Sequence, residues 1–292
     1  MNGKRNQVAV VTGASRGVGQ GIALALGALG MTVYITGRRP EQSGSNLYGH
    51  ALRGSLEQTS AAITAAGGRG IAVVCDHAED RQVQALFARV QAECGHLDLL
   101  VSNAAFIHDQ LLEPGPFWAK PLELVRILEM GLRSAYIASD YAAPLLLRSE
   151  QGLICFTSSF GAGCYMHGPA YGAQKAGCDK LAADIAIDFE GHGVAAVSLW
   201  LGPQLTERTR IAGEQHGEQY RAFLAEAETP QFNGRVIHAL LNDPHLMRLS
   251  GQTLVTAEMA PSYGISEAGG RQPPSHRARL NDPRQQHPAR VV

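Results

Sequence analysis

Short apolar runs rich in β-branched residues alternate with longer helical patterns through most of this chain, and this rhythm restricts the possible folds most strongly. Strands that are apolar throughout are buried on both faces, as in a parallel sheet covered by crossover helices. The expected strands are residues 8–12, 32–36, 71–75, 97–101, 153–157, 194–200 and 252–255. The expected helices are residues 17–29, 56–66, 80–93, 121–147 and 171–190. The pattern predicts an α/β fold, a doubly wound Rossmann domain with a mostly parallel seven-stranded sheet.

The alternation never restarts within the 292 residues, which favours one domain over residues 1–268. Residues 40–53 and 107–120 are rich in Gly, Ser, Asn and Pro, and we expect them to form long loops at the carboxyl edge of the sheet. Residues 269–292 are rich in Pro, Arg, Gln and His without apolar periodicity. They predict an extended or disordered C-terminal tail.

Charge and composition argue against several classes of function. The formal net charge is −1 with both signs scattered, so we expect no nucleic-acid partner. There is no apolar stretch of about 18 residues and no signal-peptide core, which predicts a cytoplasmic protein without a membrane anchor. Five cysteines lack CxxC spacing and the eleven histidines form no zinc motif, so we expect reduced thiols and no metal.

A glycine-rich turn follows the first expected strand and opens the first expected helix. Glycines there allow close approach of the backbone to a pyrophosphate, and the helix N-terminus favours the negative charge. The turn therefore predicts a dinucleotide site, against the alternative of an ordinary strand-to-helix turn. The residues expected to contact the cofactor here are Gly13, Ser15, Arg16, Gly17, Val18 and Gly19.

The end of the second strand indicates which dinucleotide is bound. A carboxylate at this place would bind the ribose 2′-hydroxyl, whereas an arginine would neutralise a 2′-phosphate. The chain has Arg38 there, with no acid before Glu41, and Arg16 can approach the same phosphate. We therefore expect NADP(H) to be preferred over NAD(H), the alternative being a solvated pair of arginines.

Tyr171 and Lys175 are one helical turn apart, so a helix places the phenol and the ammonium on one face. A phenol is a poor acid near neutral pH, and a nearby ammonium stabilises its phenolate form. The pair predicts a proton-transfer device for a reaction at a carbonyl group. The alternative is a core tyrosine and a surface lysine that share helical spacing by chance.

The motifs TGASRGVG at 12–19, SNAA at 102–105 and YGAQK at 171–175 resemble the classical short-chain dehydrogenase/reductase superfamily. Further stretches, among them VYITGR at 33–38 and VSLW at 197–200, resemble more closely the dehydrogenase/reductase family member 1 group, whose known members act as NADPH-dependent carbonyl reductases. The resemblance implies cofactor contacts at Asp76, Asn103, Ala104, Gly202 and Thr206, besides Tyr171 and Lys175.

Either Ser158 or Ser159 is expected to polarise the carbonyl group. Counting back from Tyr171 by the commonest family spacing selects Ser158, whereas counting along the strand from Gly152 selects Ser159. Strand position fixes the direction of a side chain, while a loop loses a residue at little cost, so we favour Ser159 as the catalytic serine. The other hydroxyl is expected to bond the backbone.

Two positions depart from the family pattern. Family members often carry an asparagine in the helix before the fifth strand, where it holds a relay water, and this chain has Gly131. The usual Pro-Gly after the sixth strand is replaced by Leu201-Gly202. These departures keep open a second hypothesis, a nucleotide-binding sensor or interaction protein with weak or no turnover.

The first hypothesis is an NADPH-dependent carbonyl reductase or alcohol dehydrogenase that acts on a ketone, an aldehyde or a secondary alcohol. Phe117, Trp118, Tyr165 and Met166 are candidate lining for a flat apolar substrate, with core packing as the alternative for each. Helices 121–147 and 171–190 resemble those that pair in this superfamily, so we expect a homodimer or homotetramer.

Overall fold

The computed structural model describes residues 6–39 and 46–291, and its centre is one sheet of seven parallel strands. The strand order is β5-β2-β1-β6-β7-β8-β9. The strands are β1 (Val8–Val11), β2 (Thr32–Gly37), β5 (Arg69–Val74), β6 (Leu99–Ser102), β7 (Gly152–Ser159), β8 (Val194–Leu201) and β9 (Thr253–Val255). The order reverses between β1 and β6, which is where a doubly wound sheet binds its ligands. The predicted fold is confirmed, and the sheet is wholly parallel.

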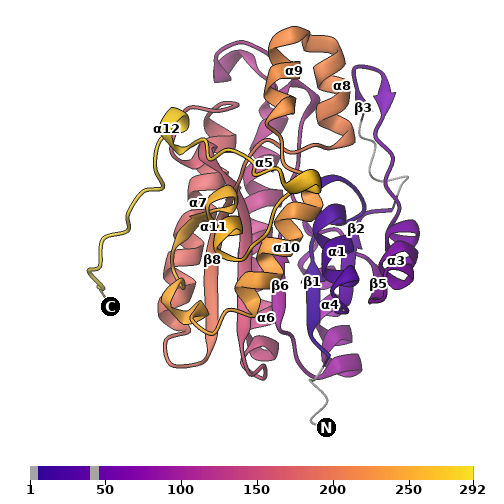
Figure 1. Cartoon of the computed structure of the whole chain (residues 1–292), viewed down its shortest axis with the longest axis vertical. Coiled ribbons are helices and arrows are strands. Elements are labelled where there is room, and N and C mark those ends of the chain that lie inside the picture. Colours follow the sequence, from indigo (N-terminus) through magenta and orange to yellow (C-terminus); the bar gives the residue numbers. More distant parts are fainter. Residues whose placement is uncertain (1–5, 40–45, 292) are drawn as a thin grey trace.

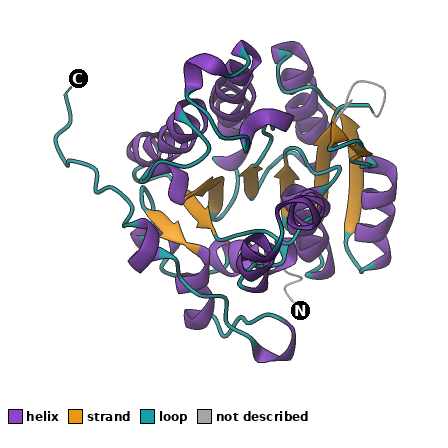
Figure 2. Ribbon diagram, turned by 90° about the horizontal axis from the view of Figure 1, so that it is seen from above, coloured by secondary structure: helices purple, strands orange, loops and turns teal. Residues whose placement is uncertain are grey.

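Helices cover both faces of the sheet (Figures 1 and 2). One core packs the helices α1 (Gly17–Ala28), α3 (Leu56–Ala65) and α10 (Pro230–Leu241) against the sheet. The other core packs α4 (Asp80–Cys94), α6 (Ser134–Leu146) and α7 (Pro169–Asp188) against the opposite face. Every residue of β1, β2, β6 and β8 is buried, which explains why these strands carry almost no polar alternation.

Two of the five expected helices differ in their bounds, and α10 lies in a region where no helix was expected. The helix expected at 121–147 is divided into η3 (Leu122–Val125), α5 (Arg126–Leu128), the π-helical turn η4 (Glu129–Arg133) and α6. The helix expected from Tyr171 begins two residues earlier at Pro169, because proline is well suited to the first position of a helix. Tyr171 therefore lies inside the first turn of α7.

Part of the loop expected at 40–53 forms a small hairpin of β3 (Asn46–Leu47) and β4 (His50–Ala51), while residues 40–45, including Glu41, lie outside the described residues. Tyr48 and Gly49 make the turn with positive φ angles of 50° and 81°. Leu47 packs with Ala212 on the helix α8 (Glu207–His216), near Tyr220 on α9 (Glu218–Ala225). The hairpin thus supports the helices that follow β8.

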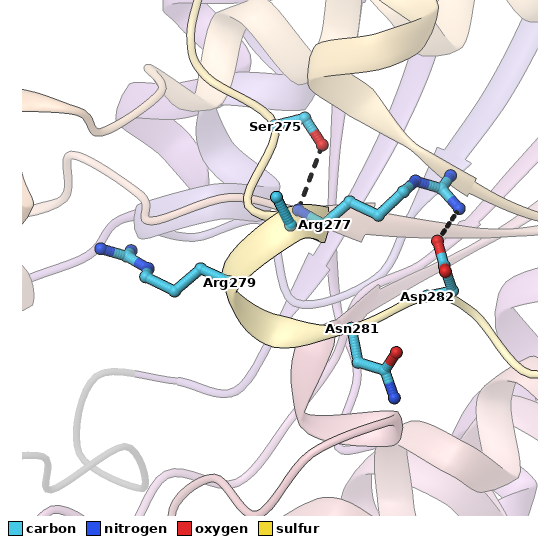
Figure 3. A pocket seen from close by; sticks show the side chains of 6 residues that line it. Ser275, Arg277, Arg279, Asn281 and Asp282 are labelled. Carbon is cyan, nitrogen blue, oxygen red and sulfur yellow. Dashed lines mark hydrogen bonds and ion pairs between the residues drawn. The ribbon is translucent and has the colours of Figure 1, made fainter.

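The C-terminal segment continues past β9 through α11 (Thr256–Ser262), η7 (Ala268–Gly270) and the one-turn helix α12 (Arg277–Leu280). His276 is buried with its ring centroid 6.1 Å from that of Phe160, and Leu280 packs into the same apolar cluster. Residues of α12 and its two ends line a shallow pocket of about 650 Å³, and Arg277 pairs there with Asp282 (Figure 3). Beyond it the chain is extended (Figure 1), and Arg290 near its end forms an ion pair with Glu190, which follows α7.

Three further observations concern the described part of the chain. None of its helices has both the length and the apolar character needed to cross a membrane. Within residues 6–39 and 46–291, no group of three or more His, Cys, Asp and Glu side chains is arranged to hold a metal ion. All five cysteines are free thiols, and burial raises the pKa of Cys155 to about 12.

Candidate active site

The residues expected to bind a cofactor or to act in catalysis lie at one edge of the sheet, where the parallel strands end. Gly13 follows β1, Arg38 follows β2, Asn103 follows β6, Ser159 ends β7 and Gly202 follows β8. Parallel strand direction brings together residues that are far apart in the sequence.

The glycine turn between β1 and α1 is a cradle that side chains would fill. Gly13 and Gly17 have positive φ angles of 65° and 59°, which favour glycine. A Cβ on Gly19 would lie 2.4 Å from the Gly13 carbonyl oxygen and 2.5 Å from Nδ2 of Asn103. Ser15 packs beside Gly37 at the end of β2, and Val18 packs against the core. The turn exposes backbone where a pyrophosphate needs N–H donors, so its shape fits a dinucleotide.

Asn103 and Ala104 hold this cradle from the neighbouring strand. Both backbone N–H groups donate to Oγ1 of Thr12, at 2.8 and 2.9 Å, and the Asn103 side chain donates to the Thr12 carbonyl at 2.9 Å. The Asn103 amide also donates to the Gly13 carbonyl at 3.2 Å. These four contacts fix the separation of β1 and β6, between which the dinucleotide of a Rossmann fold lies.

Arginines gather near the ends of β1 and β2. Nη1 of Arg16 donates to the Leu52 carbonyl at 2.7 Å, so the loop after the hairpin holds this guanidinium. Burial, and then the positive charges of Arg208 and Arg38, lower the pKa of Arg16. Arg208, on α8, also lies 3.6 Å from Asp109. Sequence reasoning missed Arg208, because only the folding of α8 back toward the glycine turn brings it near Arg16.

The remaining expected cofactor residues lie around the same edge. Asp76, after β5, accepts the N–H of Ala78 at 3.0 Å and so shapes its own turn. Thr206 caps α8 by accepting the N–H of Thr209 at 3.3 Å. The methyl group of Thr206 lies 4.0 Å from where a Cβ on Gly17 would be, which places the start of α8 against the glycine turn.

Ser159, Tyr171 and Lys175 meet at the end of β7. The Ser159 and Tyr171 hydroxyl oxygens are 3.0 Å apart. The Lys175 ammonium lies 5.5 Å from the Tyr171 ring centroid and donates to the Thr157 carbonyl at 3.1 Å. Ser158 is buried and points away from Tyr171, donating to the backbone carbonyl of Lys175 at 3.2 Å. The structure thus brings Ser159, and not Ser158, to the phenol.

Asp179, one turn after Lys175, anchors α7 to the sheet. Its carboxylate accepts hydrogen bonds from Oγ of Ser198 at 2.6 Å and from Nε1 of Trp200 at 2.9 Å. Burial raises the pKa of Asp179, against the opposing effect of these donors. These hydrogen bonds fix the position of α7 along β8, and therefore also the positions of Tyr171 and Lys175.

Two residues that follow β7, Gly161 and His167, approach the Tyr171 ring closely. A Cβ on Gly161 would lie 2.6 Å from Cε1 of Tyr171, so the loop after β7 touches the ring directly. The His167 ring, which sequence reasoning did not single out, is edge-on to Tyr171 at 5.0 Å between centroids. Phe117, Trp118 and Tyr165 are exposed, whereas Met166 packs inward near Phe160 and Trp200. Three of the four candidate lining residues thus present exposed side chains.

A glycine cradle lies at the switch point of a doubly wound sheet, and a Ser-Tyr-Lys group lies where the end of β7 meets the start of α7. Together they define a nucleotide-dependent oxidoreductase of the short-chain type. The sequence profile of the short chain dehydrogenases matches residues 7–217. This chain belongs to that family.

Individual relatives agree with this assignment. The chain is 38% identical to human "Dehydrogenase/reductase SDR family member 1", over 93% of this chain and 85% of the human protein. It is 28% identical to a "3-oxoacyl-[acyl-carrier-protein] reductase" from Synechocystis, over 85% of this chain and 94% of that protein. A variant of a Serratia marcescens short-chain dehydrogenase/reductase has the same fold, with a TM-score of 0.70 and 24% identity over 86% of this chain and 96% of its own. The chain is thus an NAD(P)-dependent oxidoreductase similar to the family member 1 group.

Proposed function

We propose that this protein is an NADPH-dependent carbonyl reductase, which acts on ketones or aldehydes and catalyses the reverse oxidation of secondary alcohols. The observation that carries this proposal is the 3.0 Å contact of the Ser159 and Tyr171 hydroxyls, with the Lys175 ammonium 5.5 Å from the Tyr171 ring. The group lies at the same sheet edge as the glycine cradle. Relatives whose names describe them as reductases support this direction of the reaction.

Each side chain has a role that its position supports. The Ser159 hydroxyl donates to the carbonyl oxygen and orients it beside the phenol. The Tyr171 hydroxyl gives its proton to that oxygen as the C=O bond becomes an alcohol C–O bond, and in oxidation the phenolate takes the proton back. The Lys175 ammonium stabilises the phenolate. When bound, the nicotinamide supplies the hydride.

The preference for NADP(H) is supported by the charges at the end of β2. Burial lowers the pKa of Arg16, and the nearby positive charges of Arg208 and Arg38 lower it further. A 2′-phosphate placed among these arginines would relieve the repulsion of their charges and accept charge-assisted hydrogen bonds. We expect Gly13, Ser15, Gly17, Val18 and Gly19 to bind the pyrophosphate. Asp76, Asn103, Ala104, Gly202 and Thr206 are expected to hold the two ends of the cofactor.

The test is consumption of NADPH, followed by absorbance, with a panel of aldehydes, ketones and quinones. At least one carbonyl compound should be reduced, and Tyr171→Phe should lower its turnover by about 10³ or more while NADPH binding is retained. Tyr136→Phe, at an exposed tyrosine on α6, is the matched control and should keep full activity. Reduction by Tyr171→Phe at nearly the parental rate would contradict the mechanism.

A cofactor-binding sensor with little turnover is the second candidate, favoured by Gly131 and Leu201 at positions where the family usually has other residues. NADPH binding without any reduction across the panel would support it. We also propose a homodimer or homotetramer in the cytoplasm, where reducing conditions suit five free thiols.

A further inference from the structure

Glu228 is a buried carboxylate to which the mechanism above assigns no role. It lies between α9 and α10 and is 1% exposed. Its Oε1 is buried without a hydrogen-bond partner among the described residues. Burial of a carboxylate is costly unless its contacts compensate, so the contacts that Glu228 does make need an explanation.

Those contacts converge on the loop 202–205, which joins β8 to α8. The Glu228 backbone N–H donates to the Pro203 carbonyl at 2.7 Å, and its own carbonyl accepts the Leu205 N–H at 2.8 Å. The side-chain Oε2 accepts the Gly202 N–H at 3.2 Å and Nε2 of Gln204 at 2.8 Å. One residue therefore bonds four consecutive residues of the loop.

The loop is also shaped to fit this carboxylate. A Cβ on Gly202 would lie 2.8 Å from Oε1 of Glu228, so the backbone approaches the carboxylate as closely as only glycine allows. The Gln204 side chain is held from its other end by Nδ2 of Asn233, at 2.8 Å. The loop contains one proline, Pro203, whose ring restrains only its own φ angle and the residue before it. Glu228 and α10 supply further contacts at Gly202, Gln204 and Leu205.

We propose that Glu228 is a positioning residue that holds the loop 202–205 in the shape required to receive the nicotinamide end of the cofactor. The proposal rests on the proposed function, in which Gly202 and Thr206 contact that part of the cofactor. This role requires no contact of Glu228 with the substrate or the reacting atoms. Glu228 acts through the backbone of the loop that it binds.

The surroundings of Glu228 favour the neutral form of its carboxyl group. Burial raises the pKa of Glu228 to about 7, and the nearby carboxylate of Glu267 also raises it. Glu267 accepts the hydroxyl of Thr229 at 2.9 Å and lies 3.6 Å from Arg235 of α10, while Arg271 donates to the Ala227 carbonyl at 2.7 Å. A neutral acceptor can make both bonds of Oε2, so the proposal depends on the shape of the side chain more than on its charge.

The experiment is amide hydrogen exchange of the full chain without cofactor, combined with calorimetric titration of NADPH. Glu228→Ala should make the amides of Gly202, Gln204 and Leu205 exchange at least about tenfold faster and should weaken NADPH binding by a similar factor. Glu228→Gln, which keeps an acceptor and the side-chain volume, should stay within about threefold of the parent in both measurements. A purely structural role would not separate these two variants at the loop.

Asp98→Ala is the matched control, since Asp98 is a buried carboxylate at the opposite edge of the sheet that accepts the Val8 N–H at 2.7 Å. It should lower stability and leave exchange at 202–205 unchanged. Gly202→Ala is the second variant, in case Glu228→Ala does not fold. Its methyl group must displace the carboxylate, and it should reproduce both the faster exchange and the weaker binding.

Unchanged loop exchange in Glu228→Ala, or equal effects of Glu228→Ala and Glu228→Gln, would overturn the proposal. Faster exchange without weaker NADPH binding would overturn the role in cofactor binding. Failure of the proposed function would be seen separately, as absence of NADPH binding to the parent protein, because the exchange measurement needs no cofactor.

Discussion

The side chain of Gln174 fills the space beside Gly131: a Cβ on Gly131 would lie 2.7 Å from Cγ of Gln174. Nε2 of Gln174 donates to the Gly131 carbonyl at 2.9 Å, within the π-helical turn η4. Gln174 is 3% exposed and directly precedes Lys175 on α7. Family members often have an asparagine at the position of Gly131. Here the side-chain amide beside that position comes instead from Gln174 on the neighbouring helix α7.

Gly131→Ala should therefore destabilise the protein by about 1–3 kcal/mol, because the new methyl group meets a buried, hydrogen-bonded side chain. Denaturant unfolding measures the effect. The double variant Gly131→Ala, Gln174→Ala removes the obstacle, so the two substitutions together should cost less than their sum. A Gly131→Ala protein as stable as the parent would show that Gln174 yields without cost.

The two serines at the end of β7 should differ in their effect on turnover. Ser159→Ala should lower kcat by about 10² or more and leave NADPH affinity little changed, because the hydroxyl beside Tyr171 stabilises the transition state. Ser158→Ala should be milder, since that hydroxyl bonds the Lys175 carbonyl. Steady-state kinetics of both variants decide the matter, and a larger loss in Ser158→Ala would favour the assignment by family spacing.

The preference for NADPH should depend on Arg38. We expect NADPH to bind at least about tenfold tighter than NADH, since a hydrogen bond to a charged group contributes about 1.5–3 kcal/mol. Arg38→Asp should abolish or reverse this ratio in calorimetric titrations. Arg39→Asp, at the exposed neighbour, is the matched control and should change the ratio less than about threefold. Equal affinities in the parent protein would contradict the arginine assignment.

Glu228 should make stability fall as pH rises toward neutrality. Its pKa is raised from an ordinary value of 4.5 to about 7, so the folded protein binds a proton in this interval that the unfolded chain has lost. The contribution is full below about pH 4.5 and is lost as pH rises to about 7, a change on the order of 3 kcal/mol. Urea unfolding at pH 5 and pH 8 measures it. Glu228→Gln should gain stability relative to the parent between these two pH values, and a constant difference would refute the shifted pKa.

The seven strands of the sheet and the helices up to α7 could be predicted because their signals are local, whereas the helices from α8 onward were not expected. Continuous apolar runs such as 194–200 bury both faces of a strand, and the observed β8 (Val194–Leu201) extends one residue further. The single long helix expected at 121–147 was wrong, because the segment is divided at η3 and η4, and at η4 the Gly131 carbonyl accepts a hydrogen bond from Gln174 of another helix. No periodicity within the segment itself reports that contact.

The candidate site, like the fold, could be predicted where its signals are local. Glycine in the turn and the four-residue spacing of Tyr171 and Lys175 are consequences of local geometry. Arg208, His167 and Glu228 were missed because each becomes a neighbour of the site only after α8, the loop before α7 or the start of α10 has packed. Single residues of common types leave no pattern in a sequence when their partners are far along the chain.

The sequence by itself determined the family, the succession of the sheet strands and of the helices up to α7, and which motifs reach the carboxyl edge of the sheet, because apolar period and strand direction are properties of each segment. Only the tertiary structure decided that Ser159 faces Tyr171, that the Leu52 carbonyl holds Arg16, and that Glu228 lies against Gly202. These are contacts between surfaces brought together by packing, and their distances depend on the shape of every element between them.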